Sequence, residues 1–342
     1  DIADKVRVLR MGFSHPLPPK LIKGFLKACQ KVLIVEEGEP YMEEAVKAMA
    51  QEEGLVLPIN GKADGLFTRL YEYNPAQVKQ CIATYFDLAY TAPEVPDLAD
   101  LPPVPQRPPT LCAGCSHRAT YHEVKKATEG MDTIFPSDIG CYTLGLLPPL
   151  SAADFLICMG SSAGTAGGFS RVNPDKKVIA FIGDSTFFHS GIPGLINAVY
   201  NNHNFTLVIL DNGTTAMTGH QPHPGVDMER MNMQGYGRVS IEKVVRAIGV
   251  EHVTLIKPYK VKKSVDAIKE SISHKGVSVI ISEEICALYA NALKLPKHKP
   301  FNITDKCKNH KTCINSLACP AFYIWNDRVK IDANLCTGCA VC

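Results

Sequence analysis

The stretch KVIAFIGDS at residues 177–185 decides the fold, together with FTLVILDNGT at residues 205–214. Each begins with an apolar run as long as a buried strand and ends in polar residues. Uninterrupted apolar strands are typical of parallel sheets that are covered on both faces. Because neighbouring parallel strands end at the same sheet edge, where α/β folds bind ligands, we expect Asp184 and Asn212 to lie close together.

The polar residues at these strand ends are typical of a magnesium and diphosphate site. Asp184 offers a carboxylate, Asn212 an amide oxygen and Thr214 a backbone carbonyl, and hard oxygen ligands of this kind suit Mg²⁺. The pattern is similar to the thiamine-diphosphate motif, in which Gly-Asp-Gly is followed by Asn-Asn after the next strand. Ser185 replaces the second glycine and Asp211 the first asparagine. The alternative is an ordinary turn between a strand and a helix.

Small and polar residues upstream are expected to line the same site. CMGSSAG at residues 158–164 follows a strand-like segment, and His117 and Arg118 follow a cysteine pair. The alternatives are tight packing for the glycines and a surface or capping role for the two cations, either of which could instead meet the diphosphate. Besides the three magnesium ligands, the expected cofactor-binding residues are Gly160, Ser161, Ser162, Gly183, Ser185 and His117.

Strand-like and helix-like segments alternate on both sides of this core, which predicts an α/β protein with parallel sheets. Before it, we expect strands at Val6–Met11, Lys31–Glu37 and Leu55–Ile59, with helices at Lys20–Gln30 and from Pro40 to about Glu53. Within it, the expected strands are Asp132–Phe135, Asp154–Cys158, Lys177–Ile182, Phe205–Leu210, Glu251–Ile256 and Val277–Ser282, and the expected helices are Ser162–Arg171, Gly191–Tyr200, Ser240–Ile248 and Val261–Ser273.

Length and composition predict two or three domains. The chain has 342 residues, 46% of them hydrophobic and 20% charged, which is enough apolar material for a sizeable core. Seven prolines between residues 92 and 110 favour an extended connector. We expect a small parallel-sheet domain at residues 1–91, a linker at 92–110, a doubly wound α/β domain at 111–296 and a ferredoxin-like tail at 297–342. A chain that starts without methionine and stops inside a cysteine motif is expected to be a fragment.

The charge balance argues against two classes of partner. Lys and Arg number 36 against 34 Asp and Glu, a formal net charge of +2. Nucleic acids and anionic membranes usually require a basic face, so neither is expected as a partner. No apolar run reaches the ~20 residues of a membrane span.

Six of the thirteen cysteines fall in the tail, in a pattern typical of iron–sulfur ligation. Cys336, Cys339 and Cys342 form C-x2-C-x2-C, which places three thiolates around one [4Fe–4S] cube, while a distant cysteine before proline supplies the fourth. Cys319, which precedes Pro320, is expected to complete this cluster.

The earlier tail run predicts a second cluster with an unusual ligand set. Cys307 and Cys313 would contribute, His310 stands where another cysteine is expected, and a further ligand would come from beyond residue 342. This cluster could use the imidazole, contain three irons or be absent. The alternatives for the tail are zinc, which favours paired C-x2-C units, and disulfides, which need an oxidising compartment.

A further set of four cysteines lies outside the tail. Cys112 and Cys115 form a C-x2-C pair in LCAGCSHRAT, Cys141 lies in PSDIGCYTLG, and Cys286 follows the last predicted strand of the α/β domain. Such a pair alone is compatible with zinc, redox chemistry or buried thiols.

These motifs resemble those of the 2-oxoacid:ferredoxin oxidoreductases. The resemblance extends through GDSTFFHSGIPGLINAVYN at residues 183–201 and ILDNGTTAMTGHQPHPG at 209–225, and the domain order resembles the large (alpha) subunit of the indolepyruvate-oxidising members. In that family four cysteines in this order hold a [4Fe–4S] cluster beside the thiazolium. The resemblance therefore implies a proximal cluster on Cys112, Cys115, Cys141 and Cys286.

The resemblance also implies an activity: oxidative decarboxylation of an aryl pyruvate with CoA, giving the acyl-CoA, CO2 and reduced ferredoxin. Thiamine diphosphate and Mg²⁺ would supply the carbanion chemistry, and two or three [4Fe–4S] clusters would carry electrons. A smaller beta subunit in a hetero-oligomer and external ferredoxin are the expected partners, and a reducing cytoplasm is the expected location. The activating Glu is expected in a pyrimidine-binding module absent from this chain, so no catalytic residue is assigned.

Two other functions fit parts of the sequence. A non-oxidative thiamine-diphosphate decarboxylase of 2-oxoacids would use the magnesium motif and leave the cysteines without a role in turnover. An electron-transfer or scaffold subunit would keep the cysteines and carry a degenerate thiamine site, which the departures at Ser185 and Asp211 motivate.

Overall fold

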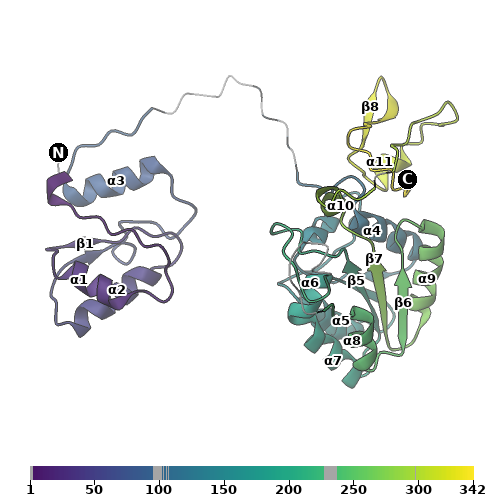
Figure 1. Cartoon of the computed structure of the whole chain (residues 1–342), viewed down its shortest axis with the longest axis horizontal. Helices are drawn as coiled ribbons and strands as arrows, with labels where there is room; N and C mark the ends of the chain where they lie inside the picture. Colours follow the sequence, from purple (N-terminus) through teal and green to yellow (C-terminus); the bar gives the residue numbers. More distant parts are fainter. Residues whose placement is uncertain are drawn as a thin grey trace. The chain divides into compact units, whose positions relative to one another are not determined.

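The computed structural model of the chain divides into two compact units, residues 1–105 and residues 106–342 (Figure 1). It describes residues 3–94, 102, 104, 106, 108–226, 237–296 and 298–342. Of the predicted linker at residues 92–110, residues 95–101, 103, 105 and 107 lie outside the described residues. The two units are described separately.

The first unit is a small α/β body. A parallel pair of two-residue strands, with Val32 opposite Ile59, lies beside helices that bury Ile22, Leu26, Val46 and Ala50. Its elements are η1 (Ala3–Lys5), α1 (Pro19–Leu26), β1 (Val32–Leu33), α2 (Tyr41–Glu52), β2 (Ile59–Asn60) and α3 (Pro75–Phe86).

The strand predicted at Val6–Met11 is wrong, and the two other strands of this unit are shorter than expected. Val8 is 87% exposed, whereas Leu9 and Met11 pack against the core of this unit, and the segment pairs with neither β1 nor β2. The strand predicted at Lys31–Glu37 ends early because Glu36 instead accepts hydrogen bonds from the backbone N–H groups of Met42 and Glu43. The carboxylate thereby satisfies free N–H groups at the start of α2, as a helix N-terminus requires.

The second unit contains a five-stranded parallel sheet in the order β3-β4-β5-β7-β6. The predicted parallel α/β fold is confirmed. The elements of its α/β part are α4 (Ser116–Ala127), β3 (Thr133–Ile134), η2 (Cys141–Leu146), α5 (Ser161–Val172), β4 (Lys177–Gly183), α6 (Asp184–Thr186), η3 (Phe187–Gly191), α7 (Ile192–Tyr200), β5 (Phe205–Asp211), α8 (Ile241–Ala247), β6 (His252–Ile256), α9 (Val261–Ser273), β7 (Val277–Glu283) and α10 (Ala287–Ala292).

Helices cover both faces of this sheet. Alternate residues of β4 point to opposite sides, so that Ile179 and Phe181 pack with α4 and α9, whereas Val178, Ala180 and Ile182 pack with α5, α7 and α8. Both faces are apolar because both are buried, which is why the central strands are uninterrupted apolar runs. The carboxyl ends of the strands then form one polar edge.

The strand predicted at Asp154–Cys158 is wrong. Only Phe155 forms a parallel bridge, to Pro136, and the carboxylate of Asp154 accepts a hydrogen bond from the Phe135 N–H at 2.8 Å. Because the Asp154 carboxylate occupies the Phe135 N–H, this N–H cannot pair with a strand carbonyl, and the pairing stops after one bridge. The segment therefore lies along the sheet margin without joining it.

The cysteine-rich tail contains α11 (Thr312–Asn315) and an antiparallel hairpin of β8 (Phe322–Trp325) and β9 (Arg328–Ile331). Asn326 and Asp327 at its turn both have positive φ, as a two-residue type I′ turn requires. Asn309 fastens the preceding loop to the hairpin, since its amide donates to the Asp327 carbonyl at 2.7 Å and accepts from the Val329 N–H.

Within the described residues, no helix has the length and apolar character needed to cross a membrane.

Candidate cofactor site

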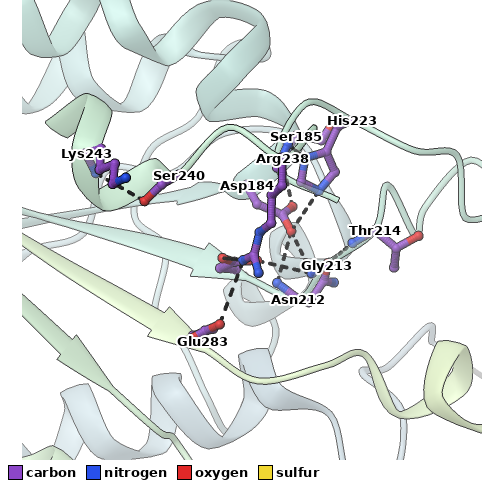
Figure 2. Close-up of polar contacts among 12 residues, drawn as sticks. Asp184, Ser185, Asn212, Gly213, Thr214, His223, Arg238, Ser240, Lys243 and Glu283 are labelled. Atoms are coloured by element: carbon purple, nitrogen blue, oxygen red, sulfur yellow. Dashed lines mark hydrogen bonds and ion pairs between the residues drawn. The ribbon is translucent and has the colours of Figure 1, made fainter. Parts of the chain in front are cut away.

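The site lies where β4 and β5 end side by side, because Gly183 pairs with Leu210 in their register. Asp184 follows β4 and is 3% exposed. Its Oδ1 accepts a hydrogen bond from the Ser185 N–H at 2.7 Å, and its Oδ2 accepts from the N–H groups of Asn212 and Gly213 at 3.1 and 2.8 Å. Figure 2 shows this carboxylate facing the turn after β5. Backbone donors from both strand ends thus orient it.

Asn212 and Thr214 lie on that turn, as the sequence predicts. The Asn212 Oδ1 accepts from the Thr214 N–H at 3.2 Å, and the Asn212 carbonyl accepts from the Cys286 N–H at 3.0 Å. Asn212 and Thr214 are 5% and 2% exposed. The structure therefore brings the three expected magnesium ligands together at one sheet edge, and Cys286 is held there by a backbone hydrogen bond.

His223 also belongs to this site, although it is not among the residues predicted above. Its Nε2 lies 3.1 Å from Asp184 Oδ2 (Figure 2), and its Nδ1 accepts a hydrogen bond from the Gly225 N–H at 3.2 Å. Because Nδ1 is an acceptor, a neutral ring carries its proton on Nε2, which lies near the carboxylate but makes no hydrogen bond within the described residues. The available signal was its place in GHQPHPG, eleven residues after Asn212.

A charged cavity of about 310 Å³ opens beside the turn. Burial and the neighbouring Asp184 raise the pKa of Asp211 to about 7, whereas Arg238 acts in the opposite direction. Figure 2 shows Arg238 reaching towards Glu283, with its Nη2 3.8 Å from both the Asp211 and the Glu283 carboxylates. Asp211, the departure from the expected asparagine, therefore shares Arg238 with Glu283. The cavity is lined by Asp211, Asn212, Gly213, Gly225, Val226, Arg238, Lys257, Glu283, Glu284, Ile285, Tyr289 and Leu295.

Asp138 organises the glycine–serine loop that precedes α5, and the sequence analysis did not assign it this role. Its Oδ2 accepts from the Ser162 hydroxyl at 2.8 Å and from the Gly160 N–H at 3.2 Å, while its Oδ1 accepts from the Tyr142 hydroxyl. Burial raises the pKa of Asp138 to about 6, although these hydrogen bonds oppose the rise. Gly160 and Ser162 thus form one polar network with Asp138.

The other predicted cofactor-binding residues, Gly183, Ser185 and Ser161, differ in how far they take part in this site. Gly183 is a point of close approach, because a side chain there would meet the Tyr142 ring. The Ser185 hydroxyl accepts from the Thr215 hydroxyl at 2.9 Å. The Ser185 backbone N–H donates to the Asp184 carboxylate, and any residue at this position could make the same hydrogen bond. Ser161 instead caps its own turn, with its hydroxyl donating to the Cys158 carbonyl at 2.8 Å. Ser161 is therefore the least involved of the predicted set.

His117 and Arg118, adjacent on α4, face different surroundings. His117 is 4% exposed, lies edge-on to Tyr142, and has no hydrogen-bond partner for either ring nitrogen among the described residues. Burial lowers its pKa to about 4, although Asp184 acts in the opposite direction, so the ring is neutral at pH 7. Arg118 instead donates to the Leu317 carbonyl at 3.0 Å. The Arg118 guanidinium is therefore bound to the tail and to the segment before α4.

Of the four cysteines expected at the proximal cluster, Cys112 lies within electrostatic range of Cys115, Cys141 and Cys286. Burial raises the pKa of Cys141, and Cys286 and Cys112 raise it further because their sulfurs lie nearby. Burial likewise raises the pKa of Cys115 to about 12, with Cys112 adding to the rise. The structure thus brings the CAGC loop, the start of η2 and the end of β7 to one place.

The tail cysteines divide into two groups. Cys319, Cys336, Cys339 and Cys342 all line one small pocket, together with Ala113 and Gly114 of the CAGC loop. Cys313 lies near both Cys307 and Cys319, since both contribute, after burial, to raising its pKa. His310 is exposed. The structure thus gathers the first expected set and leaves the second with two thiols.

Within the described ranges, no group of three or more His, Cys, Asp or Glu side chains could hold a metal ion. A [4Fe–4S] cluster differs from a single ion because each of its four thiolates binds a different iron. Thiolates are the donors that such clusters use, and the four tail cysteines that line one pocket are of this type. For Mg²⁺, the Asp184 carboxylate and the Asn212 amide oxygen are suitable donors, with diphosphate oxygens and water as its other ligands.

The region that contains this edge resembles a family of known proteins. Residues 138–282 match a family model described as thiamine pyrophosphate enzyme, C-terminal TPP binding domain. Indolepyruvate oxidoreductase subunit IorA of Methanothermobacter thermautotrophicus is 45% identical, over 98% of this chain and 54% of its own length. IorA of Archaeoglobus fulgidus is 42% identical, over 98% of this chain and 54% of its own length. The chain therefore spans about half the length of these relatives.

One solved structure is a more distant match. A chain of 2-oxoglutarate:ferredoxin oxidoreductase from Magnetococcus marinus, solved with 2-oxoglutarate, coenzyme A and succinyl-CoA bound, matches with a TM-score of 0.48 and 21% identity. The match covers 53% of this chain and 66% of that chain.

Proposed function

From the premise that the chain is a relative of IorA along 98% of its length and contains a thiamine-pyrophosphate-binding domain, we propose that it belongs to a ferredoxin-linked 2-oxoacid oxidoreductase. The proposed reaction is the oxidative decarboxylation of aryl pyruvates such as indolepyruvate with CoA. The products are the acyl-CoA, CO2 and reduced ferredoxin. A smaller beta subunit would complete the enzyme as a hetero-oligomer in the reducing cytoplasm.

One observation carries the proposal: the edge that holds Asp184 and Asn212 also holds a set of cysteines. The Asn212 carbonyl accepts the Cys286 N–H at 3.0 Å, and Cys286 lies near Cys112. A thiamine enzyme that only decarboxylates needs no thiols beside its cofactor. An electron carrier without a thiamine site would not need a buried carboxylate that accepts N–H groups from two strand ends.

In this proposal the edge residues hold the cofactor. When bound, thiamine diphosphate supplies the carbanion chemistry at the 2-oxo carbon. Asp184, Asn212 and the Thr214 carbonyl hold Mg²⁺, and Gly160, Ser162, Gly183 and Ser185 form the wall beside the diphosphate, with Ser161 at its margin. His117, neutral and with both ring nitrogens unpaired within the described structure, presents a hydrogen-bonding group there.

The departures from the thiamine motif leave this arrangement intact. Ser185 contributes a backbone N–H to Asp184, which glycine would also do. Asp211 accepts from the Gly213 N–H at 3.2 Å, so its carboxylate supports the turn that carries Asn212. Neither substitution removes a proposed ligand.

The cysteines are proposed to form the electron path. Cys112, Cys115, Cys141 and Cys286 would hold the proximal [4Fe–4S] cluster, and Cys319, Cys336, Cys339 and Cys342 a cluster in a ferredoxin-type domain at residues 297–342. Cys307 and Cys313, with His310, would belong to a second tail cluster. The remaining proposed divisions are a domain at residues 1–91, a linker at 92–110 and the thiamine-binding domain at 111–296.

The test is turnover of the enzyme assembled with its partner subunits. We expect reduction of ferredoxin that depends on both the 2-oxoacid and CoA, measured together with CO2 release. Cys115→Ser should lower ferredoxin reduction at least about hundredfold, because an electron carrier is lost. Cys29→Ser is the matched control, since Cys29 donates to the Phe25 carbonyl within the first unit.

The opposite result would identify a different enzyme. Release of a free aldehyde without ferredoxin reduction, at the same rate in Cys115→Ser as in the wild type, would show a non-oxidative decarboxylase and contradict the proposal.

A further inference from the structure

Arg118 is a buried cation without an acidic side chain beside it. It is 2% exposed, and no Asp or Glu lies within 4 Å of its guanidinium in the part of the chain that the structure describes. Its nitrogens donate to the carbonyls of Leu111, Cys112 (3.5 Å) and Leu317 (3.0 Å) and to the Thr110 hydroxyl (3.1 Å). Carbonyl dipoles orient the guanidinium but do not neutralise it.

A buried charge is costly unless a charge of opposite sign accompanies it. The acidic groups that interact with Arg118 are the thiols of Cys115, Cys319 and Cys112, which oppose the lowering of its pKa by burial. Cys112 and Cys115 belong to the proposed proximal cluster, whereas Cys319 belongs to the tail. Arg118 therefore lies between the two sets, with thiols from both as its potential counter-charges.

The same place is where the two sets approach each other. Gly114, between Cys112 and Cys115, has a φ of +67°, and a side chain there would collide with Thr337 in the tail. The Tyr259 hydroxyl, between β6 and α9, donates to the Gly114 carbonyl at 2.6 Å and fixes the position of this loop. Ala113 and Gly114 line the pocket formed by the four tail cysteines. The loop that carries two proximal thiols is thus also a wall of the tail site.

We propose that Arg118 is the shared counter-ion of two [4Fe–4S] clusters, one on the Cys112 set and one on the Cys319 set, and raises the reduction potential of both. The inference rests on the proposed function. When one electron passes between them, the proximal cluster is oxidised by one electron and the tail cluster is reduced by one. Arg118 stays protonated throughout, since guanidinium does not lose its proton in proteins. It favours the reduced, more negative form of either cluster, so no proton needs to move with the electron.

In this role Arg118 is a positioning residue that holds a positive charge near both clusters. The midpoint potentials of the clusters measure the effect of that charge directly. The experiment is an EPR-monitored redox titration of the full chain loaded with iron and sulfide, for the wild type, Arg118→Gln and Arg118→Lys. Arg171→Gln is the matched control, because Arg171 is exposed and donates to the Asn201 carbonyl far from these thiols in the sequence.

Arg118→Gln is expected to shift both midpoint potentials to more negative values. The expected change is about tenfold in the one-electron equilibrium constant, which corresponds to about 59 mV. Arg118→Lys keeps the charge and should restore most of the wild-type potential, and Arg171→Gln should leave both potentials unchanged. A merely structural role would change the iron content and leave the potentials of the loaded fraction where they are.

Three results would overturn the inference. The first is Arg118→Gln with wild-type iron content and unchanged potentials. The second is Arg118→Lys shifted as far as Arg118→Gln, which would show that shape matters rather than charge. The third is failure of both variants to load iron, which would assign Arg118 to folding. A wild-type chain that binds no iron and sulfide would instead contradict the proposed function, so the two failures are distinguishable.

Discussion

The Asp184 edge and the cysteine-rich tail differ in what organises them. At the edge, Asp184 accepts hydrogen bonds from Ser185, Asn212 and Gly213, and the central strands behind it are buried on both faces. The tail has a four-residue helix, one short hairpin and few buried apolar residues, among them Leu317 and Val329. Its thiols line a pocket but are held mainly by the loops that carry them.

The difference separates two ways of building a cofactor site. The edge is shaped by sheet register and backbone donors, so the polypeptide orders it without help. A segment of about 45 residues with so small a core usually needs a metal or a disulfide for stability. We therefore expect cofactor loading to change the tail much more than the edge.

The largest expected effect is that of iron on the tail. Loading the chain with iron and sulfide should slow backbone hydrogen exchange across residues 298–342 by about a thousandfold, or about 4 kcal/mol, because metal–thiolate bonds contribute directly to folding. Exchange at β4 and β5 should change less than about threefold. Mass-spectrometric hydrogen exchange on the loaded and iron-free chain measures both.

Cys336→Ser is the variant control for this experiment, and it should abolish most of the protection in the tail. Equal protection of β4, β5 and the tail would show that the two regions fold as one cooperative body, and the contrast between them would fail.

The next effect concerns the edge. Asp184→Ala in cofactor-free protein should lower the free energy of unfolding of the second unit by about 2–4 kcal/mol, because the N–H groups of Ser185, Asn212 and Gly213 lose a charged acceptor. Urea denaturation measures the loss, with the exposed Asp175→Ala as control. Calorimetric titration with thiamine diphosphate and Mg²⁺ should in addition show loss of binding. An unchanged stability would mean that the edge is not organised by its own hydrogen bonds.

The smallest expected effect concerns Glu123, a buried carboxylate that can be compared with Asp184. Glu123 on α4 is fully buried, and within the described structure neither of its oxygens has a hydrogen-bond partner. Burial raises its pKa to about 9, whereas Ser264 and Lys126 act in the opposite direction. The folded state therefore retains a proton that the unfolded state releases above about pH 4.3.

Stability from this group is fully present below that unfolded-state pKa and is lost as the pH rises towards the folded pKa of about 9. Between pH 6 and 7, the wild type should lose up to about 1.4 kcal/mol more than Glu123→Gln, which does not titrate. Urea denaturation at both pH values checks this, with Glu129→Gln as the exposed control. Parallel pH dependence in the wild type and Glu123→Gln would show that Glu123 is ionised when folded.

The sequence could predict the elements that pack around the sheet and the residues that end its strands. The run from Lys177 to Gly183 is apolar because it is buried on both faces, so its pattern predicts both the strand and the polar edge that follows it. Val261–Ser273 is amphipathic with helical period, and the structure has the helix at those residues. These elements have a strong local signal.

Other features have no local signal. Val6–Met11 reads as a strand, but propensity cannot report that nothing is available to pair with it. His223 lies 39 residues from Asp184 and Asp138 lies 24 residues from Ser162 in the sequence, and only the folded chain brings each pair into contact. Arg118 lies next to His117, yet successive residues on a helix point in different directions. Contacts of this kind depend on topology.

The π-helical turn η3 separates Asp184 from α7, and it gives this segment a built-in offset. A π turn contains one residue more than an α turn. Side chains after η3 are therefore rotated by about 100° around the helix axis, relative to their positions in an uninterrupted α-helix. Leu195 and Ala198 can thereby keep their apolar side against the sheet while Asp184 stays on the rim. Shortening η3 by one residue would restore a regular helix, and it would rotate either the apolar stripe or the carboxylate out of place.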